Sequence, residues 1–218
     1  MVRRLKEDKK MGIPAGGELS ADHDAAAVEQ RAAPRFTALI RSAKLVCGLG
    51  EFICVVRDVS SSGVRLRCFH DVPRDPDMAL VLPNGESFAI EPVRGEGAEA
   101  SFRFLNEVPI EALLHESKAY PRRPLRLNLA LPVTLRTLAG PAAAVTRNIS
   151  QQGCCVESPL PLALAQQVIV ESPRLPGIRA KVQWRQAGTF GLVFDDTFSL
   201  RDFAIHVARL QSPALVSG

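Results

Sequence analysis

Apolar and polar residues alternate with a period of two through most of the chain after residue 35, which is typical of short strands. In the C-terminal half, this alternation predicts strands near residues 127–138, 143–149, 153–158, 166–171, 178–186 and 189–195. Six strands in so short a segment indicate a small closed barrel, because closure removes the exposed edges of a sheet. We therefore predict a mainly β protein.

The periodicity becomes helical after the last predicted strand. Apolar residues recur at helical spacing from Leu200 to Leu210, and Ser199 is suited to cap the start of that helix. An earlier segment, PIEALLHES, predicts a shorter helix in which Pro109 suits the first turn. We expect each helix to pack on its own barrel or on the neighbouring one.

The chain contains an internal repeat. The segment RAAPRFTALIRSAKLV from Arg31 matches RRPLRLNLALPVTLRT from Arg122 at a shift of 91 residues, and RDVSSSG matches RNISQQG at a shift of 90. We therefore predict two tandem six-stranded small β-barrels, each followed by a short α-helix. The expected boundaries are a flexible tail at 1–30, a first barrel at 31–118, a second barrel at 119–211 and a C-terminal tail at 212–218.

A hairpin is predicted in the first copy between the segments MALVL and ESFAI. Asn84 and Gly85 separate these segments, and both residue types tolerate the positive φ angles of a type I′ turn. The hairpin fits the barrel prediction for this copy.

Composition and charge narrow the classes of function. The chain of 218 residues is 46% apolar, with a net charge of +4, a pI near 9.0 and only 6% aromatic residues. A single-strand binder needs aromatic rings along a basic groove, so we do not expect a polynucleotide partner. No apolar run is long enough for a membrane span, and the charged start lacks the apolar core of a signal peptide. We expect a cytoplasmic protein.

The cysteines and histidines do not indicate a metal or a catalytic site. The five cysteines form no Cys-x-x-Cys pair, and Cys54, Cys154 and Cys155 fall in strand patterns typical of core or near-core positions. The four histidines lack partners at metal-ligand spacing. No serine or cysteine has a plausible base beside it, so we predict neither enzyme activity nor a cofactor.

Two motifs recur together in both copies. An Arg-x-x-x-Arg precedes the first strand, and an Asp or Asn, then Ser, then Gly, follow the second strand. Each motif alone is ordinary: paired arginines are commonly surface residues, and in such a turn the polar side chains bond the backbone while Gly takes positive φ. In a strand, however, Asp58 and Ser60 point to one face while Val59 points to the core, so we expect the polar pair to face outward beside the arginines.

Such a pocket suits a guanine nucleotide. A guanidinium fork matches phosphate oxygens and the O6/N7 edge of guanine, and an amide or carboxylate oxygen can accept from guanine N1–H and N2–H₂. The paired motifs resemble those of the PilZ domain, a bacterial receptor for cyclic di-GMP, and VQWRQAGTFGLVF resembles the closing strands of that family. The resemblance implies a cyclic di-GMP ligand bound in both copies by residues of the two motifs: Arg31, Arg35, Asp58, Ser60 and Gly63 in the first, and Arg122, Arg123, Arg126, Asn148, Ser150 and Gly153 in the second.

The two copies differ in ways that bear on this interpretation. The first copy has Arg94 or a neighbour and Ser101 where the second has Trp184 and Gly191, and Asn148 offers one acceptor where Asp58 offers two. We favour binding in both copies, the second slightly more. The predicted function is a receptor that changes its inter-domain arrangement on binding and signals to a protein partner. The alternatives are a module like the flagellar brake proteins, in which only the second barrel binds nucleotide, and a small-barrel nucleic-acid binder.

Overall fold

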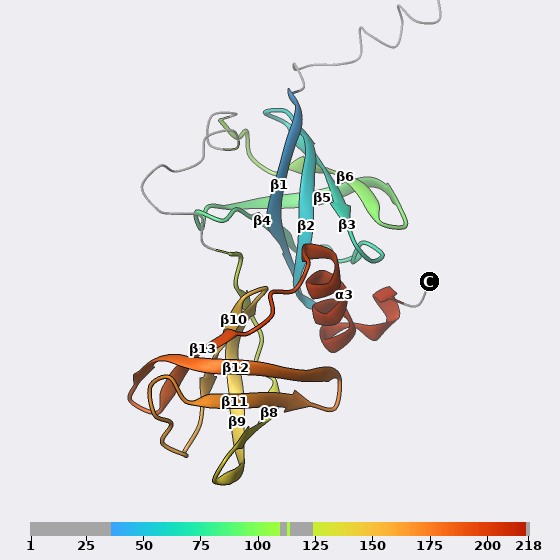
Figure 1. Cartoon of the computed structure of the whole chain (residues 1–218). Helices are drawn as coiled ribbons and strands as arrows, with labels where there is room; N and C mark the ends of the chain where they lie inside the picture. Colours follow the sequence, from blue (N-terminus) through green and yellow to red (C-terminus); the bar gives the residue numbers. More distant parts are fainter. Residues whose placement is uncertain (1–35, 110–112, 114–123, 217–218) are drawn as a thin grey trace, which may run out of the picture. The chain divides into compact units, whose positions relative to one another are not determined.

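The computed structural model describes residues 36–109, 113 and 124–216, with the side chains of residues 36–40 left out. Residues 31, 35, 122 and 123, and most of the helix predicted after Pro109, lie outside the described residues. In the first copy, six strands form a closed antiparallel barrel in the order β1-β2-β3-β6-β5-β4 (Figure 1). Their bounds are β1 Phe36–Cys47, β2 Gly50–Val59, β3 Gly63–Cys68, β4 Met78–Val81, β5 Ser87–Glu96 and β6 Glu99–Phe104.

The second copy forms a barrel with the same strand order, β8-β9-β10-β13-β12-β11, in which β11 pairs with β8 to close the ring. A short extra strand, β7, pairs with β9 outside this ring. The bounds are β7 Leu127–Asn128, β8 Pro132–Thr137, β9 Gly140–Ser150, β10 Gly153–Glu157, β11 Gln167–Ser172, β12 Leu175–Gln186 and β13 Thr189–Phe194. The prediction of two six-stranded barrels is confirmed.

The strand registers of the two barrels correspond residue by residue. Phe36 pairs with Val59 in the first barrel, and Leu127 pairs with Ile149 in the second. These pairs are related by the same shifts of 91 and 90 residues that align the two halves of the sequence. The first strand predicted at 127–138 is divided, however, into β7 and β8.

The side chain of Thr146 explains the division between β7 and β8. Its hydroxyl accepts from the N–H of Leu131 at 2.9 Å and donates to the carbonyl of Leu129, so it takes the place of ladder hydrogen bonds there. Pro132 follows directly and has no N–H to offer the ladder. In the first barrel β1 runs through the equivalent region, with a register shift between Thr37 and Arg41.

Each barrel has its own apolar core, made by the inward-facing residues of alternating strands. The C-terminal helix α3, Leu200–Gln211, adds Phe203, Ala204 and Val207 to the second core. As predicted, Ser199 caps this helix, because its side chain accepts from the N–H of Asp202. A 3₁₀ helix, η1, follows at Pro213–Val216. No helix in the described ranges is both long and apolar enough to span a bilayer.

Strand β2 is buried on both faces, which is unusual for a barrel strand with a solvated outside. Phe52 and Cys54 point into the first core, whereas Ile53, one position along, packs with the core of the second barrel. Helix α3 contacts β2 (Figure 1). Its Ala208 packs with the first core. The final helix therefore packs both on its own barrel and on the neighbouring one, which confirms the prediction.

The turn at Asn84-Gly85 differs from the prediction. Gly85 has a φ of 92°, but Asn84 is not among the residues with positive φ, so the turn is not type I′. Instead, the N–H of Gly85 donates to the carbonyl of Leu82 at 2.9 Å, and Pro83 occupies the position where its fixed φ favours a type I turn. Two consecutive positive φ angles occur at Ala187 and Gly188, between β12 and β13.

The glycines of the two polar motifs have a different role from the one predicted. Neither Gly63 nor Gly153 has a positive φ. A Cβ added at Gly153 would lie 2.1 Å from the carbonyl oxygen of Leu192 on β13, and one at Gly63 would lie 2.7 Å from that of Phe102 on β6. Glycine is needed at both positions because neighbouring backbone approaches too closely for any side chain.

We expect the substitution Gly153→Ala to lower the free energy of unfolding by about 1–3 kcal/mol or more, because the backbone of β10 or β13 must move to admit the methyl group. Gly177→Ala is the matched control, since its added Cβ would meet only side-chain atoms, the nearest at 3.5 Å. Urea denaturation of both variants checks this. Equal midpoints for the two would contradict the close-approach explanation.

The imidazole of His70 supports a second prediction, about pH. The side chain is 5% exposed and its ring lies 5.3 Å from that of Phe52. Its Nδ1 lies 2.7 Å from the carbonyl oxygen of Asp71, while Nε2 has no hydrogen-bond partner in the described part of the chain. Burial lowers the pKa of His70, against smaller opposing effects of Asp71.

Because the pKa of His70 is lower in the folded state, the unfolded chain binds the proton more readily. The free energy of unfolding is therefore highest above the unfolded pKa, near 6.5, and falls as the pH drops below it. The free energy of unfolding should therefore decrease between pH 7 and pH 5. His70→Asn keeps a donor for the Asp71 carbonyl but cannot titrate, so its decrease should be shallower. Urea denaturation at several pH values measures both slopes; parallel slopes would show that His70 does not contribute.

Candidate functional site

The candidate site in the second barrel begins where β7 meets β9. Leu127 of β7 is fully buried in the core, so Arg126 and Asn128 on either side of it face outward. Asn128 pairs with Asn148, and Ile149 beside it is buried, so Asn148 also faces outward. The Nη1 of Arg126 donates to Oδ1 of Asn148 at 2.9 Å. The structure thus brings together one residue from each predicted motif.

The serines of the motifs do not face outward as predicted. Ser150 is 1% exposed and its hydroxyl donates to the carbonyl of Gly153 at 3.1 Å, while Ser60 makes the same turn with Gly63 in the first barrel. The prediction assumed that strand alternation would leave the serine hydroxyl exposed, but in each hairpin the hydroxyl turns back to bond the backbone carbonyl of the glycine. These hydroxyls fix the turn that presents Asn148 and Asp58.

The first barrel places Asp58 differently from Asn148. Its carboxylate, 25% exposed, lies 3.8 Å from Nη1 of Arg65, and Nη2 of the same guanidinium bonds Glu99 at 2.6 Å. Asp58 pairs with Thr37 of β1, which is the counterpart of Asn128. The arginines predicted beside it, Arg31 and Arg35, lie outside the described residues.

An outward-facing row of residues crosses the second barrel from Asn148. Along the ladder, Asn148 pairs with Cys155, Cys155 with Gly191, and Gly191 with Trp184. The indole of Trp184 covers Gly191, since a Cβ there would fall within 1.9 Å of its Nε1. In the first barrel the same ladder runs through Asp58, Arg65, Ser101 and Arg94, as the sequence comparison predicted for the last two.

Cys155 belongs to this row, although the sequence indicated a core or near-core position. Cys154 is in the core, and Cys155 faces the other side of the sheet, where it is 7% exposed. Burial raises the pKa of Cys155, against the smaller effects of Arg147 and Arg126, so its thiol stays protonated at neutral pH. Strand alternation was the signal that could have placed it: adjacent cysteines in a strand cannot share a face.

Asn128 and Glu51 were not among the predicted site residues, and they connect this site to the first barrel. The backbone N–H and the Nδ2 of Asn128 both donate to the carboxylate of Glu51, each at 2.8 Å. Lys44 donates to the same carboxylate at 3.0 Å. The backbone of Glu51 in turn exchanges two hydrogen bonds with the side chain of Gln211 in α3. No local sequence pattern marks such a long-range contact.

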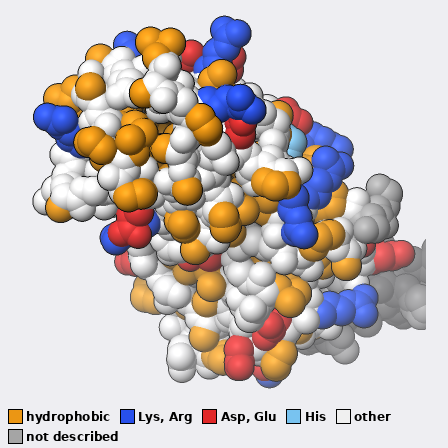
Figure 2. Space-filling model, turned by 90° about the horizontal axis from the view of Figure 1, so that it is seen from below, with side chains coloured by type: hydrophobic (Ala, Val, Ile, Leu, Met, Phe, Trp, Pro, Cys, Tyr) orange, Lys and Arg blue, Asp and Glu red, His pale blue; other side chains and the backbone are white. Residues whose placement is uncertain are grey.

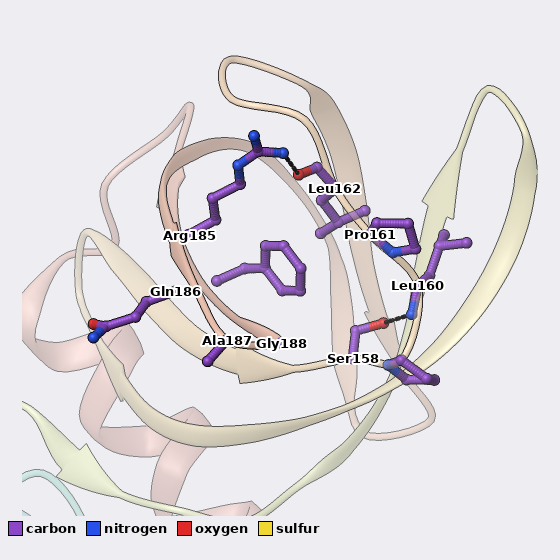
Figure 3. A pocket seen from close by; sticks show the side chains of 10 residues that line it. Ser158, Leu160, Pro161, Leu162, Arg185, Gln186, Ala187 and Gly188 are labelled. Atoms are coloured by element: carbon purple, nitrogen blue, oxygen red, sulfur yellow. Dashed lines mark hydrogen bonds between the residues drawn. The ribbon is translucent and has the colours of Figure 1, made fainter.

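A pocket of about 450 Å³ lies elsewhere on the second barrel, between the 158–162 loop and the turn joining β12 to β13 (Figure 3). Arg185 reaches across it, and its Nη1 donates to the carbonyl of Leu162 at 3.4 Å. Leu160 and Pro161 make much of its wall apolar. None of the predicted site residues lines this pocket.

The described residues form no metal-ligating cluster, and on one face of the molecule their cationic side chains are dispersed. No group of three or more metal-ligating side chains lies together among the described residues. On the face shown in Figure 2, lysine and arginine side chains stand in separate small groups among hydrophobic and uncharged ones.

Comparison with known proteins gives one family match. The model of the PilZ domain family matches residues 118–210. No curated protein sequence matches the chain. Among solved structures, the chain is similar to the Borreliella burgdorferi PlzA protein in complex with c-di-GMP, with 12% identity, a TM-score of 0.35, and coverage of 87% of this chain and 97% of that one.

Two further solved structures are similar at the same level. The Bacillus subtilis inhibitor of motility MotI/DgrA has 12% identity and a TM-score of 0.32, over 79% of this chain and 97% of that one. Escherichia coli YcgR in complex with c-di-GMP has 9% identity and a TM-score of 0.31, over 77% and 82%. The family match, which includes β7 and the whole second barrel, carries the assignment. The chain therefore contains a PilZ domain, at residues 118–210.

Proposed function

We propose that the protein is a cytoplasmic, non-enzymatic receptor for cyclic di-GMP, which binds at the outward face of the second barrel. The observation that carries the proposal is the contact between Arg126 and Asn148 within a PilZ domain. It supports the pairing of the two motifs in space, which their separation in the sequence could only suggest.

The chemistry of these two side chains suits a guanine nucleotide. The guanidinium of Arg126 can bond phosphate oxygens or guanine O6 and N7 in a bidentate way, and Oδ1 of Asn148 can accept from guanine N1–H or N2–H₂. In the free protein the two side chains bond each other. Arg126 is exposed, so it can turn toward a ligand with little loss of packing and leave Asn148 free to accept.

Further residues complete the proposed site. Arg122 and Arg123, which precede Arg126 in the same motif, would add phosphate and purine contacts. Ser150 and Gly153 would hold the turn that presents Asn148 rather than contact the ligand directly, because the serine hydroxyl is already bonded within the turn. A few bidentate contacts of about 1–3 kcal/mol each would suffice for micromolar affinity, about −8 kcal/mol.

The proposed signal is a change in how the two barrels are arranged. Asn128 lies two residues after Arg126, opposite Asn148, and holds Glu51 of the first barrel through two hydrogen bonds. A ligand that moves β7 would alter these bonds directly. The altered arrangement would then be read by a protein partner.

Binding is tested by isothermal titration with cyclic di-GMP. We expect Arg126→Ala and Asn148→Ala each to weaken binding about tenfold or more, because each removes a specific contact with the ligand. Arg136→Ala is the matched control: it removes an exposed arginine of the same barrel that pairs with Glu171 at 2.7 Å and lies opposite Pro141, seven residues along β9 from Asn148. Absence of heat with the unmodified chain would refute the proposed ligand.

Signalling between the barrels is tested by small-angle X-ray scattering of free and ligand-bound protein. In Glu51→Ala the bonds that hold Asn128 are gone before ligand arrives, so we expect a smaller ligand-induced change in the radius of gyration than in the unmodified chain, with affinity within about threefold. Glu86→Ala, which removes a carboxylate bonded to Asn84 in a hairpin of the first barrel, is the control. An unaltered change in Glu51→Ala would rule out this route.

A further inference from the structure

The first barrel carries a complete Asp-x-Ser-x-x-Gly motif, yet its Asp58 is already engaged. Arg65 stands opposite Asp58 on the neighbouring strand β3 and lies across the outer face of the sheet. Its Nη1 approaches Asp58 on β2 and its Nη2 bonds Glu99 on β6, at 3.8 Å and 2.6 Å. One guanidinium therefore spans three strands at the position where a ligand would contact the motif.

The second barrel has Cys155 at the position of Arg65. The registers establish this correspondence, because Asn148 pairs with Cys155 just as Asp58 pairs with Arg65. Cysteine is small and its thiol here is uncharged. The β10 position beside Asn148 thus carries no long side chain, whereas the matching β3 position beside Asp58 carries one that covers it.

Glu99 holds Arg65 in this covering position. The hydrogen bond from Arg65 is the main cause of the lowered pKa of Glu99, and Arg67 and Arg57 lower it further through their charges. Glu99 therefore remains a carboxylate at neutral pH and keeps its bond to Arg65. A guanine that approached Asp58 would have to displace a guanidinium that is anchored from the opposite side.

The rest of the row in the first barrel also differs from a nucleotide-binding face. Arg94 and Ser101 replace Trp184 and Gly191, and they border a hollow of about 610 Å³ that Glu96 and Glu99 also line. The positive charges at this hollow are thus accompanied by carboxylates, which would repel the phosphates of a cyclic dinucleotide. Neither charge nor stacking surface favours the ligand here.

We propose that only the second of the two motifs binds cyclic di-GMP, and that Arg65 is the residue that closes the first. The proposal rests on the proposed function of the second barrel. It assigns to Asp58 the role of counter-ion for Arg65, in place of a ligand contact, although the sequence motif is intact.

The test is titration of cyclic di-GMP into four forms of the full chain. The unmodified protein gives the number of ligands per chain and the affinity. Arg126→Ala/Asn148→Ala, which disables the second site only, should show no saturable binding at ligand concentrations 100-fold above the dissociation constant of the unmodified protein. Asp58→Ala should keep the ligand number, with an affinity within about twofold, since Asp58 would not contact ligand. Arg65→Ala removes the guanidinium that covers Asp58, so it should raise the ligand number per chain.

The outcomes separate this proposal from the one on which it rests. Saturable binding that survives in Arg126→Ala/Asn148→Ala and disappears when Asp58→Ala is added would overturn the closed first motif, and so would a smaller ligand number in Asp58→Ala. An unchanged ligand number in Arg65→Ala would overturn the closing role of Arg65. In each of these cases the receptor function would stand. An unmodified protein that takes up no ligand would instead remove the receptor function, and this inference with it. Thermal melts of each variant verify that the fold is retained.

Discussion

The candidate site depends on the pairing of a two-residue strand, β7, with the end of β9. Leu127 is fully buried and lies opposite Ile149, which is also buried, so this apolar pair fixes both the register and the side of the sheet on which their neighbours lie. Arg126 and Asn148 meet outside the barrel because Leu127 and Ile149 meet inside it. A shift of one residue would turn Arg126 toward the core and separate the two motifs.

The first barrel repeats this backbone register, which shows what duplication preserved. Phe36 and Val59 pair as Leu127 and Ile149 do, and both motif glycines lie against a neighbouring carbonyl. Backbone geometry is thus shared between the copies. The outward positions carry no such constraint, and there the copies have diverged, from Cys155 and Trp184 in one to Arg65 and Arg94 in the other. One fold therefore presents two chemically different surfaces.

Most of the fold could be predicted because alternation and repetition can both be read from the residue types along the chain. Strand positions, the final helix with its Ser199 cap and the correspondence between Arg94 and Trp184 followed from them. Other features depend on distant atoms. Glycine is needed at 153 because of the carbonyl of Leu192. Asp58 is covered by Arg65 because Glu99, forty-one residues further along the chain than Asp58, holds that guanidinium. Residue type alone suggested a turn with positive φ in one case and a free carboxylate in the other.

Contacts between the barrels were the least visible in the sequence, and they matter most for how binding could be transmitted. Five consecutive residues of β2, Phe52 to Val56, are buried, a pattern that indicates a strand covered on both sides rather than one facing solvent. The side chain of Ile53 packs in the second core, while Glu51 at the start of the same strand bonds both Asn128 and Gln211.

Strand β7, which bears the site, makes two kinds of contact. Leu127 packs in the second core, and Asn128, which lies opposite Asn148, bonds Glu51 of the first barrel. Moving Leu127 out of the core would expose apolar surface to water, which is unfavourable. The hydrogen bonds to Glu51 can instead be replaced by hydrogen bonds to water at a small net free-energy cost. A ligand that pulls on Arg126 should therefore release the contact to the first barrel before it disturbs the barrel that binds it.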